Sequence, residues 1–160
     1  MKTSSVHTII AALAFAGLLG TLCVSNAHAQ RRPGAVGIGG QIGDPSGVTL
    51  TIYNPQSMSY DFLVAWDTDD FFFLNAHGLF EQHLGGRGNL HFFYGPGAFI
   101  GFRDRGNEED DEAVAGISGR VGLGVLFDRF EVYGQVTPRL ALTPATDGEI
   151  GGGVGFRIYF

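Results

Sequence analysis

Three acidic and three basic residues stand where the local alternation of residue types would put them on one face with glycines and small polar side chains. They are Asp61, Glu81, Arg120, Glu131, Arg139 and Arg157. Charges taken out of water are stable when opposite charges pair. Equal numbers of each sign on an enclosed face therefore predict a closed ion-pair network. The alternative is a gate or an anion site held by Arg120 and Arg139, and nothing in their spacing favours it.

Two histidines flank a glycine-rich turn and are candidates for metal binding. His83 and His91 would face each other across this turn, with Glu81 close by. Two imidazoles and a carboxylate are suitable zinc ligands, but a structural zinc site needs a fourth ligand and a spaced motif. The sequence shows neither, so we predict no metal and no cofactor.

The parts of a hydrolytic triad also occur on the polar face, as Ser118, His77 and Asp61. Geometry, and not the presence of these residue types, decides whether they act together. We predict that the chain is not an enzyme. A lipid-modifying enzyme remains an alternative, which a Ser–His pair on the opposite, apolar face would favour.

The stretch 107–112 contains one asparagine followed by five acidic residues. A run of like charge is usually a solvated loop. Its carboxylates could also collect divalent cations, although the spaced pattern of a calcium-binding loop is missing. We expect a solvated extracellular loop.

The first 29 residues have the form of a secretory signal peptide. Lys2 is followed by an apolar run over 9–22, and the segment closes with Ala27-His28-Ala29, a small-residue cleavage pattern. We expect cleavage after Ala29. The run is too short and too glycine-broken for a retained membrane anchor, and Leu22 before Cys23 does not fit a lipoprotein signal.

Cleavage changes the composition of what remains, which we expect to be one domain over 30–160. The only cysteine leaves with the signal, so the domain has no disulfide. Lys2 leaves as well, so the domain keeps nine of the ten basic residues and all sixteen acidic ones, which gives a net charge of −7. A nucleic-acid partner would need a basic surface, and we predict none.

The residues after the signal read as β-strands separated by turns. Alternating runs are broken by Gly-, Pro-, Asn- and Asp-rich segments, and no window shows a sustained helical period. This pattern predicts eight antiparallel strands, at about 35–43, 47–53, 58–66, 71–83, 90–103, 113–127, 130–143 and 149–160.

Alternation divides the last three predicted strands into an apolar and a polar face. A tight turn at Asp128-Arg129 would pair Phe127 with Phe130 and so bring the apolar faces of two strands to the same side. The apolar face is nearly free of charge, and the polar face carries charges among many glycines. An eight-stranded barrel has an interior that side chains fill, and an apolar exterior is the transmembrane pattern. We predict an up-and-down transmembrane β-barrel; a charged outer face would instead favour a soluble, lipocalin-like ligand-binding barrel.

Aromatic residues are expected in two belts, since aromatic rings prefer membrane interfaces. One end of the predicted barrel would carry Tyr53, Tyr60, Phe80, Phe92, Phe127, Phe130, Tyr159 and Phe160, and the other Trp66, Phe71, Phe72 and Phe102.

The last six residues resemble the C-terminal signal of bacterial outer-membrane barrels. Gly155, Ile158 and Phe160 match its glycine, apolar and terminal aromatic positions, whereas Val154 departs from the polar residue common before the glycine. The whole domain is similar in architecture to small barrels of the outer-membrane protein A and X type. This resemblance implies export through the inner membrane, insertion by the barrel assembly machinery, contact with outer-membrane lipid and lipopolysaccharide, and a monomer. The resemblance indicates a location and not an activity, and we predict a structural or surface-interaction role.

Overall fold

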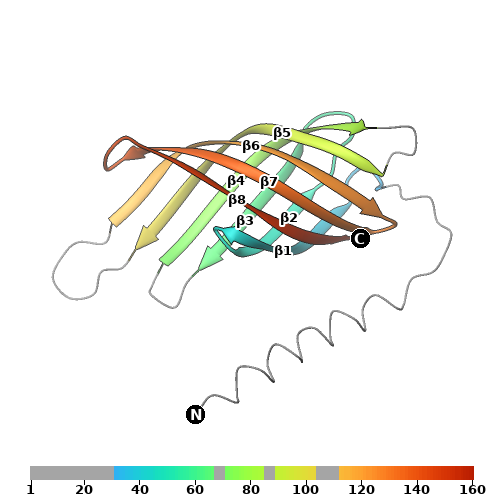
Figure 1. The fold of residues 1–160 in the computed structure, drawn as a ribbon, viewed down its shortest axis with the longest axis horizontal. Coiled ribbons are helices and arrows are strands. Elements are labelled where there is room, and N and C mark those ends of the chain that lie inside the picture. The colour runs from blue at the N-terminus through green and yellow to red at the C-terminus, as the bar shows by residue number, and fades with distance from the viewer. Residues whose placement is uncertain (1–30, 67–70, 85–88, 104–111) are drawn as a thin grey trace, which may run out of the picture.

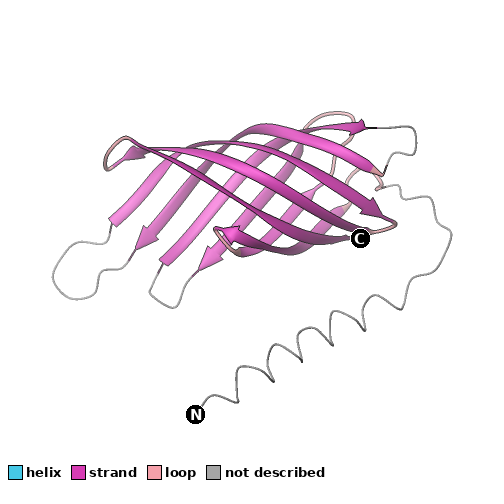
Figure 2. Ribbon diagram, in the orientation of Figure 1, coloured by secondary structure: helices cyan, strands magenta, loops and turns pink. Residues whose placement is uncertain are grey.

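Eight strands form the wall of a closed antiparallel barrel in the computed structural model of the chain (Figure 1), which describes residues 31–66, 71–84, 89–103 and 112–160. The strands are β1 Val36–Asp44, β2 Gly47–Ile52, β3 Ser59–Trp66, β4 Phe71–Leu84, β5 Leu90–Arg103, β6 Glu112–Phe127, β7 Phe130–Thr143 and β8 Asp147–Tyr159. These bounds lie within two residues of the predicted ones. The predicted all-β fold class is confirmed, and every regular element of the described residues is a strand (Figure 2).

Each strand pairs with its neighbour in sequence, and β8 pairs with β1 to close the barrel. We call the end where β1 begins and β8 ends the terminal mouth, and the other end the distal mouth. Within the described ranges, no helix is long and apolar enough to cross a membrane.

The β6–β7 hairpin has the predicted register. Phe127 pairs with Phe130 across Asp128-Arg129, and Asp128 has a φ of 56°. Aspartate tolerates this left-handed conformation better than most residues. Because side chains alternate along a strand, this pair places the following side chains on their predicted faces as far as the register shift between Ala115 and Gly116.

The outer wall is apolar. Side chains such as Ile42 (77% exposed), Ile150 (75%) and Val154 (63%) project outward, while residues of alternate parity such as Thr49 and Asp61 are fully buried. The outward and inward faces predicted from the alternation are therefore those of the structure, with polar groups inside.

The lumen also holds apolar side chains that the sequence analysis did not place there. Phe73 and Phe99 stack near the distal mouth, with ring centres 5.6 Å apart. Leu79 and Phe93 pack with Tyr133 nearer the terminal mouth. Glycines on neighbouring strands make room for such rings. A methyl group at Gly116 would lie 2.8 Å from Phe99 Cε1, closer than packed carbons come.

Two members of the predicted aromatic belts point inward instead. Tyr53 and Tyr159 are only 5% and 2% exposed, and they belong to the same cluster of buried side chains at the terminal mouth. Both stand at inward parity, and each finds a polar partner for its ring or hydroxyl in the lumen. The outward rings remain, including Tyr60 and Phe80 at the terminal mouth and Trp66, Phe72 and Phe102 at the distal mouth. The side chain of Phe71 lies outside the described residues.

Candidate functional site in the barrel lumen

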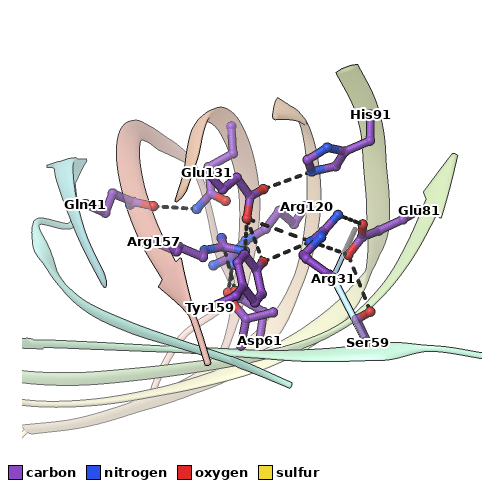
Figure 3. Close-up of polar contacts among 12 residues, drawn as sticks. Arg31, Gln41, Ser59, Asp61, Glu81, His91, Arg120, Glu131, Arg157 and Tyr159 are labelled. Carbon is purple, nitrogen blue, oxygen red and sulfur yellow. Dashed lines mark hydrogen bonds and ion pairs between the residues drawn. The ribbon is translucent and has the colours of Figure 1, made fainter. Parts of the chain in front are cut away.

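Four of the six predicted charged residues meet at the centre of the lumen, each from a different strand (Figure 3). Arg120 of β6 donates a hydrogen bond to Asp61 of β3. Arg157 of β8 bridges the two acids, with Nη2 3.1 Å from Asp61 Oδ2 and Nη1 3.7 Å from Glu131 Oε2. The acids are fully buried, and both guanidinium groups nearly so. We call these four residues the central cluster.

Three further side chains complete the hydrogen bonding of its two acids. Thr51 Oγ1 donates to Asp61 Oδ2 over 2.6 Å. Tyr159 donates its hydroxyl to Glu131 Oε2 over 2.6 Å, and His91 Nε2 lies 2.8 Å from Glu131 Oε1. Carboxylates held by several donors are stable out of water. The cluster therefore has the features of a structural ion-pair network.

Glu81 pairs with a residue that the sequence analysis missed. Its Oε2 lies 2.5 Å from Nη2 of Arg31, in the segment before β1. Burial lowers the pKa of Arg31, but Tyr159, Glu81 and Glu131 raise it by more, so the net pKa is above the usual value and the group stays charged. Alternation along strands could not reveal Arg31, because it precedes the first strand.

Arg139 lies apart from the central cluster, at the distal mouth. Its Nη2 is 3.2 Å from Asp44 Oδ2 and also 3.2 Å from Glu149 Oε2, two acids that are 64% exposed and that the sequence analysis did not choose. Its guanidinium sits 5.3 Å from the ring centre of Phe73. Arg120 and Arg139 therefore occupy separate ion-pair groups, which argues against the alternative in which they hold one anion together.

The three residues considered as a hydrolytic triad come together only in part. Ser118 Oγ lies 3.0 Å from His77 Nε2 and 3.1 Å from Asn75 Oδ1. Asp61 is bound by arginines and Thr51, and His77 Nδ1 has no hydrogen-bond partner among the described residues. The acid that orients the histidine in a triad is therefore engaged elsewhere.

The two histidines at the β4–β5 turn pair across the hairpin, as their spacing suggested. Their ring centres are 6.4 Å apart. His83 is exposed, whereas His91 is buried and turned toward Glu131. Over the described ranges, no group of three or more His, Cys, Asp or Glu residues is arranged to hold a metal ion.

The residues of the C-terminal pattern lie on both sides of the wall. Phe160 is 74% exposed, Ile158 is half-buried on the outer side, and Gly155 faces the lumen. A methyl group at Gly155 would lie 2.5 Å from Tyr133 Cζ. Packing thus supplies a reason for this glycine that is independent of any assembly signal.

No protein-family model matches the sequence, and no curated protein matches it. Two solved structures are similar. One is the N-terminal β-barrel domain of OprF from Pseudomonas aeruginosa, with a TM-score of 0.60 and 13% identity over 79% of this chain and 96% of that domain. The other is Neisserial surface protein A, with a TM-score of 0.47 and 10% identity over 79% of this chain and 95% of that protein.

The likeness to the OprF domain extends over 79% of this chain at an identity too low to carry function. It establishes that this chain has the eight-stranded barrel fold of that domain.

Proposed function

We propose that the chain is an integral outer-membrane β-barrel with a closed, ion-paired lumen and a structural or surface-interaction role. The observation that carries the proposal is the apolar outer wall. Residues such as Ile117 (54% exposed), Leu123 (49%) and Val136 (49%) project from the middle of the wall. A continuous apolar surface of this kind is unfavourable in water and is the pattern of a barrel in lipid.

The same wall disfavours a soluble, ligand-binding barrel. Such a barrel would expose charge outside and keep an apolar cavity inside. Here the centre of the lumen contains Asp61, Glu131, Arg120 and Arg157, all buried, and aromatic rings pack above and below them.

Three features favour the bacterial outer membrane. They are the signal-like segment 1–29, the C-terminal pattern ending at Phe160, and the shared fold with the OprF domain. Outer-membrane lipid, lipopolysaccharide and the barrel assembly machinery are the partners that we propose, with a monomer as the functional form.

One observation favours the second candidate, an enzyme. The Ser118–His77 hydrogen bond is the contact that a serine nucleophile needs with its base. It lies inside the lumen, away from the lipid-facing wall, and lacks an orienting acid. We therefore rank the structural role first.

Fractionation tests the proposal. The protein should remain with outer membranes after carbonate washing, and an unheated, detergent-folded sample should migrate differently from a boiled one on a denaturing gel. Identical migration together with full solubility in the absence of detergent would contradict a membrane barrel. Hydrolysis of a lipid ester by the wild type that the Ser118→Ala variant lacks would favour the enzyme instead.

A further inference from the structure

Two consecutive arginines before β1 have opposite surroundings. The side chain of Arg31 is 2% exposed inside the terminal mouth, whereas Arg32 is exposed. Burying a guanidinium is costly unless it is paired and hydrogen-bonded. The contrast between these neighbours shows that the barrel end provides a specific place for one of them.

That place is lined by two ring faces and two carboxylates. The Cζ atom of Arg31 lies 4.1 Å from the ring centre of Tyr53 and 4.9 Å from that of Tyr159. Its Nη2 is 2.5 Å from Glu81 Oε2, and its Nη1 is 3.8 Å from Glu131 Oε2. The Nη1 group also donates a 2.9 Å hydrogen bond to the hydroxyl of Tyr159. Figure 3 shows Arg31 extended between Glu81 and Tyr159.

These contacts suit a guanidinium better than an ammonium ion. A planar fork stacks on aromatic faces while its edge donates several hydrogen bonds to carboxylates. An ammonium ion is also attracted to ring faces and donates hydrogen bonds, but it has no planar face that could stack on the rings while its edge donates to the carboxylates. We call Tyr53, Glu81, Glu131 and Tyr159 the guanidinium cage.

A β-turn over residues 32–35, which the sequence favours, positions Arg31 at the cage. In residues 32–35, Pro33 and Gly34 occupy the central positions, Gly34 has a φ of 84°, and Ala35 N–H donates to Arg32 C=O over 2.9 Å. This is a type II turn, in which proline precedes a glycine of positive φ. Gly34 N–H also donates to Tyr53 C=O over 2.8 Å, which fixes the turn against the end of β2.

We propose that the guanidinium cage is a binding site for alkylguanidinium groups, which the chain fills with its own Arg31, and that it accepts such a group from solution when Arg31 is removed. In the wild type, Arg31 then anchors the segment before β1 across the terminal mouth. The inference goes beyond the proposed function, since it requires the barrel fold and not any particular membrane.

The test compares Arg31→Ala with Arg32→Ala, a matched loss of one charge from the same segment. Both variants of the full domain are folded into lipid vesicles and unfolded with urea. Losing a charged, hydrogen-bonded group should raise the unfolding equilibrium constant of Arg31→Ala by about ten- to a hundredfold, and Arg32→Ala should unfold like the wild type. Equal stability of the two variants would contradict the cage.

Chemical rescue identifies the ligand class. Ethylguanidinium chloride is added to each protein and compared with the same concentration of ethylammonium chloride. At ten times its Kd, ethylguanidinium should raise the folded-to-unfolded ratio of Arg31→Ala about elevenfold, with no such gain in Arg32→Ala. No rescue, or equal rescue by ethylammonium, would overturn the proposal.

If Arg31→Ala does not fold, Arg31→Lys tests whether the cage requires a guanidinium group. Lysine keeps the charge but lacks the fork, so this variant should fold and be less stable than the wild type, while Arg32→Lys should not differ from it. Wild-type stability of Arg31→Lys would show that charge alone suffices and would refute a guanidinium site.

Discussion

Replacing Arg120 with methionine should destabilise the barrel through one identified partner. Methionine keeps much of the volume but removes the guanidinium that donates to the fully buried Asp61. Breaking a buried pair from one side typically costs about 3–5 kcal/mol. Arg157 and Thr51 still contact Asp61, so we expect about 3 kcal/mol, at the lower end of that range.

Urea unfolding in lipid vesicles measures this loss and identifies the partner. In a double-mutant cycle, Arg120→Met and Asp61→Asn should be less destabilising together than the sum of the single changes, with a coupling of about 1–3 kcal/mol. Glu81→Gln is the matched control, because Glu81 bonds Arg31 and not Arg120. Its cycle with Arg120→Met should show a coupling near zero.

Two results would refute this reasoning. Arg120→Met that unfolds like the wild type would mean that the buried pair contributes no stability. Coupling to Glu81 as large as that to Asp61 would mean that the effect of Arg120 does not depend on its direct contact with Asp61.

Other predictions concern packing, the distal mouth and conduction. Gly155→Ala should lower the free energy of unfolding by about 1–3 kcal/mol through overpacking, because the added methyl would lie 2.5 Å from Tyr133 Cζ and 2.6 Å from the backbone oxygen of Gly40. The control is Gly134→Ala, whose methyl would meet only Val154 at 3.8 Å and which should unfold in urea like the wild type. Equal losses of stability in the two variants would contradict the packing argument. Asp44→Asn removes one of the two ion pairs of Arg139 and should change the free energy of unfolding by less than about 1 kcal/mol, because ion pairs with an exposed partner contribute little and Asp44 is 64% exposed. A larger loss would show that this pair is effectively buried. In planar bilayers the purified protein should show no large, steady conductance, because an eight-stranded lumen is filled by side chains, and porin-sized steps would contradict a closed lumen.

The sequence alone was sufficient for the strands and for the face of nearly every residue in them. Strand alternation is a local property with a period of two, and turns are marked by residues with their own backbone preferences. The pairing of Phe127 with Phe130 follows from the two-residue turn between them. Once the apolar face was taken as the outside, the inward positions of Asp61, Arg120 and Glu131 followed as well.

Only the tertiary structure decided which inward groups meet. Arg157 contacts Asp61 from across the barrel, and Arg139 meets acids at the distal mouth, because the stagger between strands sets the height of each side chain in the lumen. Local alternation carries no information on that stagger.

The contents of the lumen were likewise beyond local pattern. Phe99 fits inside because Gly116 stands beside it on the next strand. Alternation puts Tyr159 on the inner face but does not predict its hydrogen bonds with Glu131 and Arg31. Arg31 itself precedes every strand and enters the barrel through a turn. A residue's face is a property of its own strand, whereas its partner depends on how all eight strands close, and for that physical reason the sequence determined the wall and the tertiary structure determined the site.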